Sequence, residues 1–438
     1  MTKKKVDENY LEKIRKISDA VVKAQMPIRI LDIIKWPEHV KHKFFENKCK
    51  QQPEITVADY HQNLKFDIRK KAEEFLDIEQ MIIQQLGQFN TVGGILRRMC
   101  QEYSTVLRML NACGTSEFSK LSKLLYGSPK DVFHEGDPTI TQLGSVMASA
   151  LTKMGKSKHL QEDPRNISAE KAVAMLQTRL NRHFHESDKT LRVLLDDGII
   201  SDAAAGADYI KIRQDAWFNK RDIRILEVHE GFVHIATTLN GKLQPYCTFL
   251  SKGPPSSTIT QEGLAVLMEI ISLSSFPARL KKIANRIRAI ELAEDGATFL
   301  EVFNYFRQEN FDDETAYVFT ARVFRGSLPT LGPFTKDLSY SKGFVTVYNF
   351  LQLAIKKGEL HLIPLLFCGK TKLEDLRDLY QLQKQGIVKR AKFLPPQIKD
   401  LNAICAWMCF TSFINTLTSE KIESDYDYLF SHKNMLRQ

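Results

Sequence analysis

The stretch Ile225-Leu-Glu-Val-His-Glu-Gly-Phe-Val-His-Ile-Ala236 places two histidines and two glutamates in an otherwise apolar segment of helical character. Because the flanks are apolar, we expect His229 and His234 to be buried, where a polar side chain without a partner is costly. One metal ion would satisfy both imidazoles at once. The stretch therefore predicts a metal-binding helix, with Glu230 beside the metal.

The spacing of the two histidines, which lie five positions apart, restricts the geometry of that helix. On a regular α-helix, with about 100° per residue, their side chains would point about 140° apart. A π-type turn, or one histidine that leans over, would bring the rings together, and Gly231 makes local distortion easier. The alternative is that both are core histidines without a metal.

A catalytic zinc ion needs a third protein ligand and keeps its fourth position for water. Glu262, in the string Thr260-Gln-Glu-Gly-Leu-Ala265, follows His234 and lies near the start of the next predicted helix. Taken alone, such a carboxylate is more typical of a helix N-terminus, where it interacts favourably with the helix dipole. Together with the two histidines, Glu262 indicates a His₂Glu zinc site.

The same strings resemble a known family. Gln261-Glu-Gly-Leu-Ala265 and His229-Glu-Gly-Phe-Val-His234 are similar to the motifs of the QEGLA-motif proteins, whose bacterial members are called flavohemoglobin expression-modulating. Their superfamily includes the microtubule-associated tyrosine carboxypeptidases, which share an HExxxH zinc site and remove a C-terminal tyrosine from tubulin. Similar strings also occur at 203–213, 321–326 and 333–337.

This resemblance implies a zincin-like metallopeptidase core, formed by the HExxxH helix and a following helix that carries the third ligand. It further implies Zn²⁺ bound by His229, His234 and Glu262, with Glu230 as the catalytic base that takes a proton from water. It does not carry the tubulin substrate across, because the similar strings contain no recognisable tubulin-binding surface.

Further candidates lie in or just after the similar strings. Tyr340, Arg322 and Arg325 are candidate electrophiles for the tetrahedral oxyanion, with Tyr340 the catalytic candidate. A carboxypeptidase must also hold a free carboxylate, for which we consider Arg322, Arg325 and Lys336. A core or surface role is the alternative for each residue. The strand expected over 207–213 could align an extended peptide as an added edge strand.

Hydrophobic periodicity predicts a mainly α fold with a small β-sheet (α+β). We expect a mainly helical N-terminal portion over 1–185 and a metallopeptidase portion over 186–432, joined in one compact unit. Strands are expected over 191–195 and 207–213, and a capping box of Thr258 and Gln261 is expected to open the second ligand helix, to about 272. Other helices are expected over 8–25, 68–85, 92–111, 142–153, 168–185, 222–239, 277–294, 296–308, 313–325, 336–357, 372–385 and 400–417.

Composition narrows the class of protein. The 43% hydrophobic content is ordinary for a folded protein, and no apolar run approaches the ~20 residues that cross a bilayer, so we expect no membrane partner. Seven scattered cysteines without a CxxC pair favour a reducing, cytoplasmic location. The net charge of +10 indicates either a solvated basic surface or an acidic partner, and no nucleic-acid-binding signature is present. The oligomeric state is not defined by these patterns.

We therefore expect a zinc-dependent peptidase, specifically a carboxypeptidase that removes a C-terminal residue from peptides or protein tails. One alternative is an endopeptidase or another amide hydrolase. The other is a non-catalytic regulator that contains zinc and binds an acidic partner through a basic surface. Glu230 argues against the regulator, because a structural zinc site needs ligands but no base.

Overall fold

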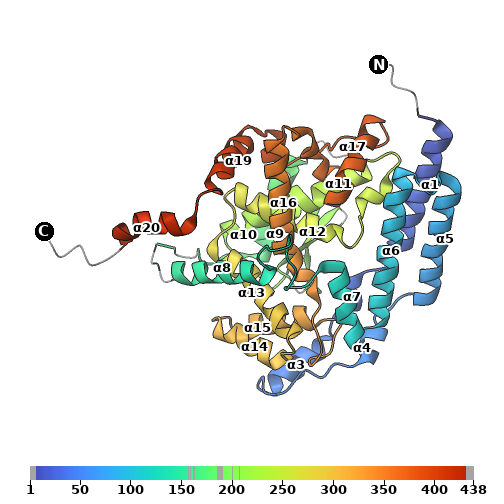
Figure 1. The fold of residues 1–438 in the computed structure, drawn as a ribbon. Coiled ribbons are helices and arrows are strands. Elements are labelled where there is room, and N and C mark those ends of the chain that lie inside the picture. Colours follow the sequence, from blue (N-terminus) through green and yellow to red (C-terminus); the bar gives the residue numbers. More distant parts are fainter. Residues whose placement is uncertain are drawn as a thin grey trace, which may run out of the picture.

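The computed structural model describes residues 6–155, 157, 159–160, 163–184, 191–199, 201–206 and 208–430. The fold is mainly helical and has two small sheets, as the sequence predicted (Figure 1). Among these residues, no helix combines the length and the apolar character needed to cross a membrane.

Three N-terminal helices pack side by side and cover one flank of the central helices (Figure 1). Asp67 and Asn90 accept backbone N–H groups at the starts of the second and third helices, which satisfies donors that a helix start leaves free. The inner faces of all three helices join the core that contains the central helices. They are α1 (Glu8–Gln25), α5 (Ile68–Leu86) and α6 (Thr91–Asn111).

A second core is rich in aromatic side chains and lies below the central helices in Figure 1. Phe44, Phe299 and Tyr317 pack against one another at its centre, with ring centroids 5.3–5.6 Å apart. Its helices and those that flank it are α2 (Ile30–Ile33), α3 (Glu38–Glu46), α4 (Val57–His61), α7 (Ser116–Tyr126), α8 (Ile140–Met154), α13 (Pro277–Glu294), α14 (Phe299–Gln308) and α15 (Asp313–Phe324).

The larger sheet has the order β2-β4-β3 and packs against α9 (Ala169–His183). Strand β2 (Arg192–Asp196) runs parallel to β4 (Tyr209–Arg213), and β3 (Ala203–Ala205) runs antiparallel to β4. A two-stranded sheet pairs β1 (Ile167–Ser168) with β5 (Trp217–Phe218).

The idea that the strand over 207–213 accepts a peptide at its edge is wrong. Strand β4 is central, so its backbone groups are already paired on both sides, and the short β3 lies at the edge. Alternation of buried and exposed positions, which β4 does have, identifies a strand but does not locate it in the sheet. Position 207 itself lies outside the described residues.

Two helical segments cross at the centre of the molecule. The first combines α10 (Lys220–Leu226), the π-helix η1 (Glu227–Ile235) and α11 (Ala236–Lys242) without a break. The second is α12 (Ser257–Ile271), which packs on η1 and on α16 (Ser339–Lys356). The helix expected over 336–357 begins as a 3₁₀ turn, η3 (Thr335–Leu338).

The capping box expected from Thr258 and Gln261 does not form. The N-cap of α12 is Ser256, whose side chain accepts no backbone hydrogen bond. Instead, Glu102 of α6 accepts both the backbone N–H (3.0 Å) and the hydroxyl of Ser256 (2.8 Å). The cap therefore comes from a distant helix, which a local motif cannot reveal.

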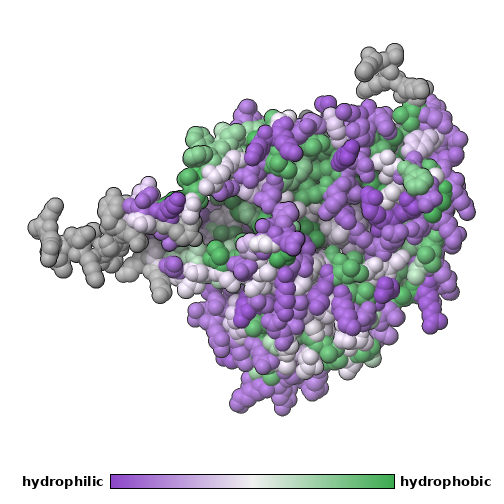
Figure 2. Space-filling view, in the orientation of Figure 1, coloured by the Kyte–Doolittle hydropathy of each residue, from purple (hydrophilic) through white to green (hydrophobic). Residues whose placement is uncertain are grey.

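The C-terminal part continues through 3₁₀ turns and short helices to an arm. Helix α20 projects from the body in Figure 1. Helix α19 carries exposed apolar side chains, among them Phe410 and Phe413, and Figure 2 shows a hydrophobic surface over this helix. Between α19 and α8 the surface in Figure 2 is hollowed. The elements are η2 (Thr248–Ser251), η4 (Leu360–Leu362), η5 (Pro364–Phe367), η6 (Leu373–Asp375), α17 (Leu376–Lys384), α18 (Pro396–Lys399), α19 (Asn402–Ile414) and α20 (Ser419–Phe430).

Helices α12 and α16 touch backbone to backbone. A Cβ atom added to Gly263 would lie 2.2 Å from the carbonyl group of Gly343, and one added to Gly343 would lie 2.0 Å from the carbonyl oxygen of Ile259. No side chain fits in this contact, so the two glycines set the distance between the helices. Because Gly263 follows Glu262 in the chain, the contact also fixes the position of Glu262, a predicted metal ligand.

We predict that Gly343→Ala destabilises the protein by about 1–3 kcal/mol, the typical cost of overpacking, because the methyl group would collide with rigid backbone. Gly94→Ala is the matched control, since a Cβ there meets only the end of the Arg98 side chain at 3.5 Å. Denaturant unfolding of both variants measures the difference. Equal stability of the two would contradict the close contact.

Candidate metal centre

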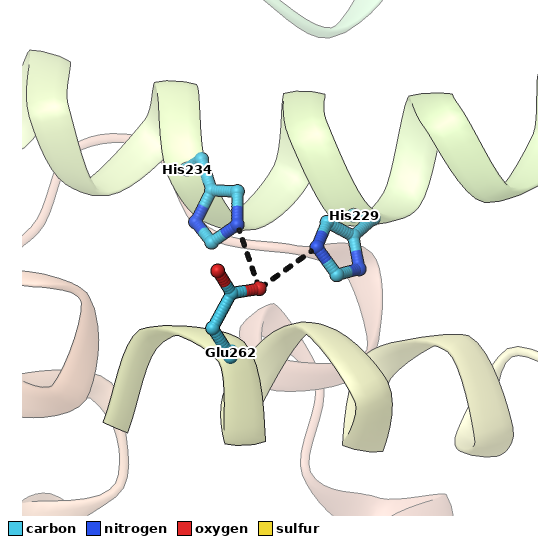
Figure 3. Close-up of side chains that lie close together, drawn as sticks. All are labelled: His229, His234 and Glu262. Atoms are coloured by element: carbon cyan, nitrogen blue, oxygen red, sulfur yellow. Dashed lines mark hydrogen bonds and ion pairs between the residues drawn. The ribbon is translucent and has the colours of Figure 1, made fainter. Parts of the chain in front are cut away.

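The segment with the two histidines is a π-helix over Glu227–Ile235, which confirms one of the two geometries that the sequence predicted. Hydrogen bonds that span five residues place positions five apart on the same side of the helix. His229 and His234 therefore both point toward α12 (Figure 3). Gly231 allows a close approach, because a Cβ there would lie 2.4 Å from Leu180 of α9.

Figure 3 shows His229, His234 and Glu262 converging on one point. Glu262 Oε2 lies 3.3 Å from His229 Nε2 and 3.6 Å from His234 Nε2, and one donor atom from each residue lies within 4.8 Å of the others. Ligands on a tetrahedral zinc ion at bond lengths of about 2.0–2.2 Å are about 3.4 Å apart. The two distances to Glu262 are close to this value, and the three residues form a group that could hold a metal ion.

The residues around Glu262 explain how α12 holds this position. Gln261 accepts a hydrogen bond from the Thr237 hydroxyl (2.8 Å), which ties α12 to α11. Gly263 provides the backbone contact with α16 described above. Gln261 thus links α12 to α11, Glu262 supplies a candidate ligand, and Gly263 contacts α16.

A buried ion pair supports His229 from behind. Its Nδ1 lies 2.7 Å from Glu269 Oε1, and the guanidinium of Arg279 donates to both Glu269 oxygens at 2.9 and 3.1 Å. Glu269 is fully buried. A hydrogen bond from Nδ1–H to a carboxylate leaves Nε2 free to bind a metal, and such partners orient metal-bound histidines.

Electrostatics keep the His229 imidazole and the Glu262 carboxylate in complementary charge states. Burial opposes charge on His229, yet its hydrogen bonds to Glu262 and Glu269 raise its pKa to about 10. Burial also opposes ionisation of Glu262, but Lys336 and the two histidines hold its pKa well below the ordinary value. Without a metal, one proton on His229 balances this anionic site, and a cation can take the place of that proton.

Glu230 lies on the same π-helix, next to His229. Its Oε2 accepts a hydrogen bond from the backbone N–H of Ala205 at 3.0 Å. Strand β3 thus orients the carboxylate of the candidate base.

Tyr340 stands at the start of α16 and its ring lies 6.2 Å from the His229 ring. Burial and the charge of Glu262 raise the pKa of Tyr340 to about 12, so the phenol is a hydrogen-bond donor at neutral pH. The guanidinium of Arg286 lies 4.8 Å from the centre of the tyrosine ring.

The three residues proposed from sequence to bind a carboxylate have different surroundings. Arg322 donates two hydrogen bonds to Asp337, at 2.8 and 2.9 Å. Lys336 Nζ lies 3.5 Å from Glu262 Oε1, beside the candidate metal. Arg325 is buried, and its nearest acidic partner is Asp337 at 3.8 Å.

Four residues of this network were not identified from the sequence: Glu269, Arg279, Arg286 and Asp337. Glu269 carried a usable signal, because it lies seven positions after Glu262 and two helical turns place both on one helix face. The two arginines belong to α13, whose sequence shows only a helix that begins at a proline. Their direction depends on how α13 packs.

A search of curated proteins found no match. A family model described as microtubule-associated tyrosine carboxypeptidase matches residues 42–416, which include every residue of the centre described above. The match covers most of the 438 residues. The chain therefore belongs to the microtubule-associated tyrosine carboxypeptidase family.

Proposed function

We propose that the protein is a zinc-dependent carboxypeptidase that removes a C-terminal residue from a protein tail. The observation that carries this proposal is the convergence of His229, His234 and Glu262, with Glu230 adjacent on the same π-helix. Family membership indicates a peptidase of the carboxypeptidase type. The spacing of the three donor atoms supports zinc as the metal.

When bound, zinc supplies a Lewis acid and lowers the pKa of a water molecule to about 7. Glu230 takes the proton of the attacking water and delivers it to the leaving amine. The backbone N–H of Ala205 keeps the Glu230 carboxylate in place for both transfers. Tyr340, which stays protonated, donates a hydrogen bond to the oxyanion.

In this proposal, η1, α12 and β3 form a zincin-like core. The N–H of Ala205 points to Glu230 and away from β4, so the outer edge of β3 faces the candidate metal site. A substrate backbone can pair with that edge, which would set its scissile bond beside Glu230. This assigns to β3 the role that the sequence suggested for β4.

The substrate that best fits this proposal is an acidic protein tail ending in tyrosine. Tyrosine is the residue named in the description of the family. The net charge of +10 favours an acidic partner, because opposite charges speed and orient association.

We predict that the wild type and Glu230→Gln each bind about one zinc per chain, whereas His234→Ala binds none, because His234 is a ligand in this proposal and Glu230 is not. Only the wild type should release the terminal residue from an acidic peptide ending in tyrosine. Elemental analysis and mass spectrometry of the peptide measure the two results. Unchanged zinc content in His234→Ala would exclude the assigned centre, and full activity of Glu230→Gln would exclude the assigned base.

We also predict that Glu269→Gln weakens zinc binding about 10- to 100-fold, because the neutral amide is a poorer partner for the Nδ1–H of His229. Competition with a chelator of known affinity measures this change. Glu309→Gln, at the partly exposed end of a different helix, is the control and should bind zinc as the wild type does. Equal affinity of both variants would show that Glu269 does not support the ligand.

A further inference from the structure

Three arginines share one carboxylate next to the candidate metal centre. Arg322 makes two short hydrogen bonds to Asp337, while Arg286 Nε and Arg325 Nη2 lie 3.7 and 3.8 Å from its oxygens. Among the described residues, Asp337 is the acidic partner within ion-pair distance of all three. The group formed by Arg286, Arg322, Arg325 and Asp337, here called the arginine cluster, therefore has an excess of two positive charges.

Several donors of the arginine cluster have no partner. Nε and Nη1 of Arg286 and Nε of Arg325 are buried from solvent and make no hydrogen bond. The two side chains are only 11% and 9% exposed. Buried donors of this kind are rare, because each costs the free energy of desolvation without compensation. They indicate an anion that the folded chain does not itself supply.

The charge imbalance also affects the two arginines themselves. Burial and the neighbouring Arg322 charge lower the pKa of Arg325 to about 10, and burial with Arg322 also lowers that of Arg286. By contrast, burial opposes charge on Arg322 but Asp337 outweighs it and raises the pKa of Arg322. Within the cluster, Asp337 thus balances the charge of Arg322, whereas the charges of Arg286 and Arg325 are not balanced.

The arginine cluster lies close to the candidate metal centre. A single ring, that of Tyr340, separates Arg286 from His229, at 4.8 Å from the guanidinium and 6.2 Å from the imidazole. The arginine cluster and the candidate metal centre are thus neighbours on the two sides of one aromatic ring.

Space is present beside the cluster. Arg322 and Arg325 line a cavity of about 620 Å³ together with Trp36, Tyr317 and Ala321. The cavity wall is mixed, because Trp36 and Tyr317 lie beside charged residues such as Lys41 and Asp215.

Resting on the proposed function, we propose that Arg286 and Arg325 form the subsite that binds the terminal carboxylate of the substrate, with Arg322 and Asp337 as the support that positions them. The assignment differs from the sequence-based candidates in two ways. Arg286 enters as a main contact, and Lys336 is assigned to Glu262. A peptide amide lacks the negative charge that the subsite requires, so the enzyme acts at chain ends and excludes internal bonds.

Binding tests this subsite independently of hydrolysis. An acidic peptide ending in tyrosine is prepared as the free acid and as the C-terminal amide, with a fluorescent label at its N-terminus. Fluorescence anisotropy measures binding to zinc-loaded Glu230→Gln protein and to metal-free protein. We expect the free acid to bind about 10- to 100-fold more tightly than the amide, as charge-assisted bidentate hydrogen bonds imply.

Adding Arg286→Gln or Arg325→Gln to the parent protein should remove that preference, because only the binding of the free-acid peptide should weaken. Arg286→Lys, which keeps the positive charge, should retain part of the preference. Arg288→Gln is the matched control, because Arg288 lies on the same helix but is half-exposed and pairs with Glu291. Neither test variant should lower the melting temperature, since each removes a charge that is in excess.

The outcomes separate the subsite from the proposed function. A free-acid preference that persists in Arg286→Gln and Arg325→Gln, or is absent from the parent protein, overturns the subsite. Loss of affinity for both peptides to the same extent also overturns it, because that result indicates a structural role. A wild type that binds the free acid preferentially, contains zinc and still cleaves neither peptide leaves the subsite standing and overturns the proposed function.

Discussion

The centre of the molecule depends on one geometric constraint: two histidines five residues apart must reach the same carboxylate. On a regular α-helix the two side chains would point about 140° apart, whereas the π-helix over Glu227–Ile235 brings them to one side. The carboxylate of Glu262 must then approach closely from a second helix. The contact between Gly263 and Gly343 sets that approach by fixing α12 against α16, which lies on its other side. Ligand spacing is therefore a consequence of helix packing.

Charge is organised around this centre in alternating layers. Glu262 contacts the two histidines and Lys336, and Glu269 links His229 to Arg279. The ring of Tyr340 then lies between His229, on the side of the candidate metal centre, and Arg286 of the arginine cluster. Burying so many ionised groups adds little to stability, because desolvation offsets the attraction between them. Their concentration in one place is instead typical of a functional site, where charges are held ready for a ligand.

Much of the secondary structure followed from periodicity, and the exceptions have physical causes. The helix over 277–294 has the predicted limits, since a proline at its first position marks its start. The predicted capping box of α12 was wrong because Glu102, which is distant in sequence, accepts the hydrogen bond from the N-cap residue instead. The prediction that β4 is an edge strand was wrong, because the alternation of residues shows which face of a strand is buried but not which strands lie beside it.

The sequence by itself indicated the candidate ligands, the candidate base and two geometries for the histidine helix, a π-type turn or a leaning histidine, because these depend on residue types and on spacings along the chain. The position of Glu269 near the candidate ligands could also have been predicted, because it lies two helical turns after Glu262 on the same helix. Only the tertiary structure decided that Arg279 supports Glu269, that Arg286 and Arg325 keep unsatisfied donors and that β3 orients Glu230. These facts arise from α13, α15 and the sheet meeting the central helices. Contacts between segments distant in sequence depend on packing, which no local pattern encodes.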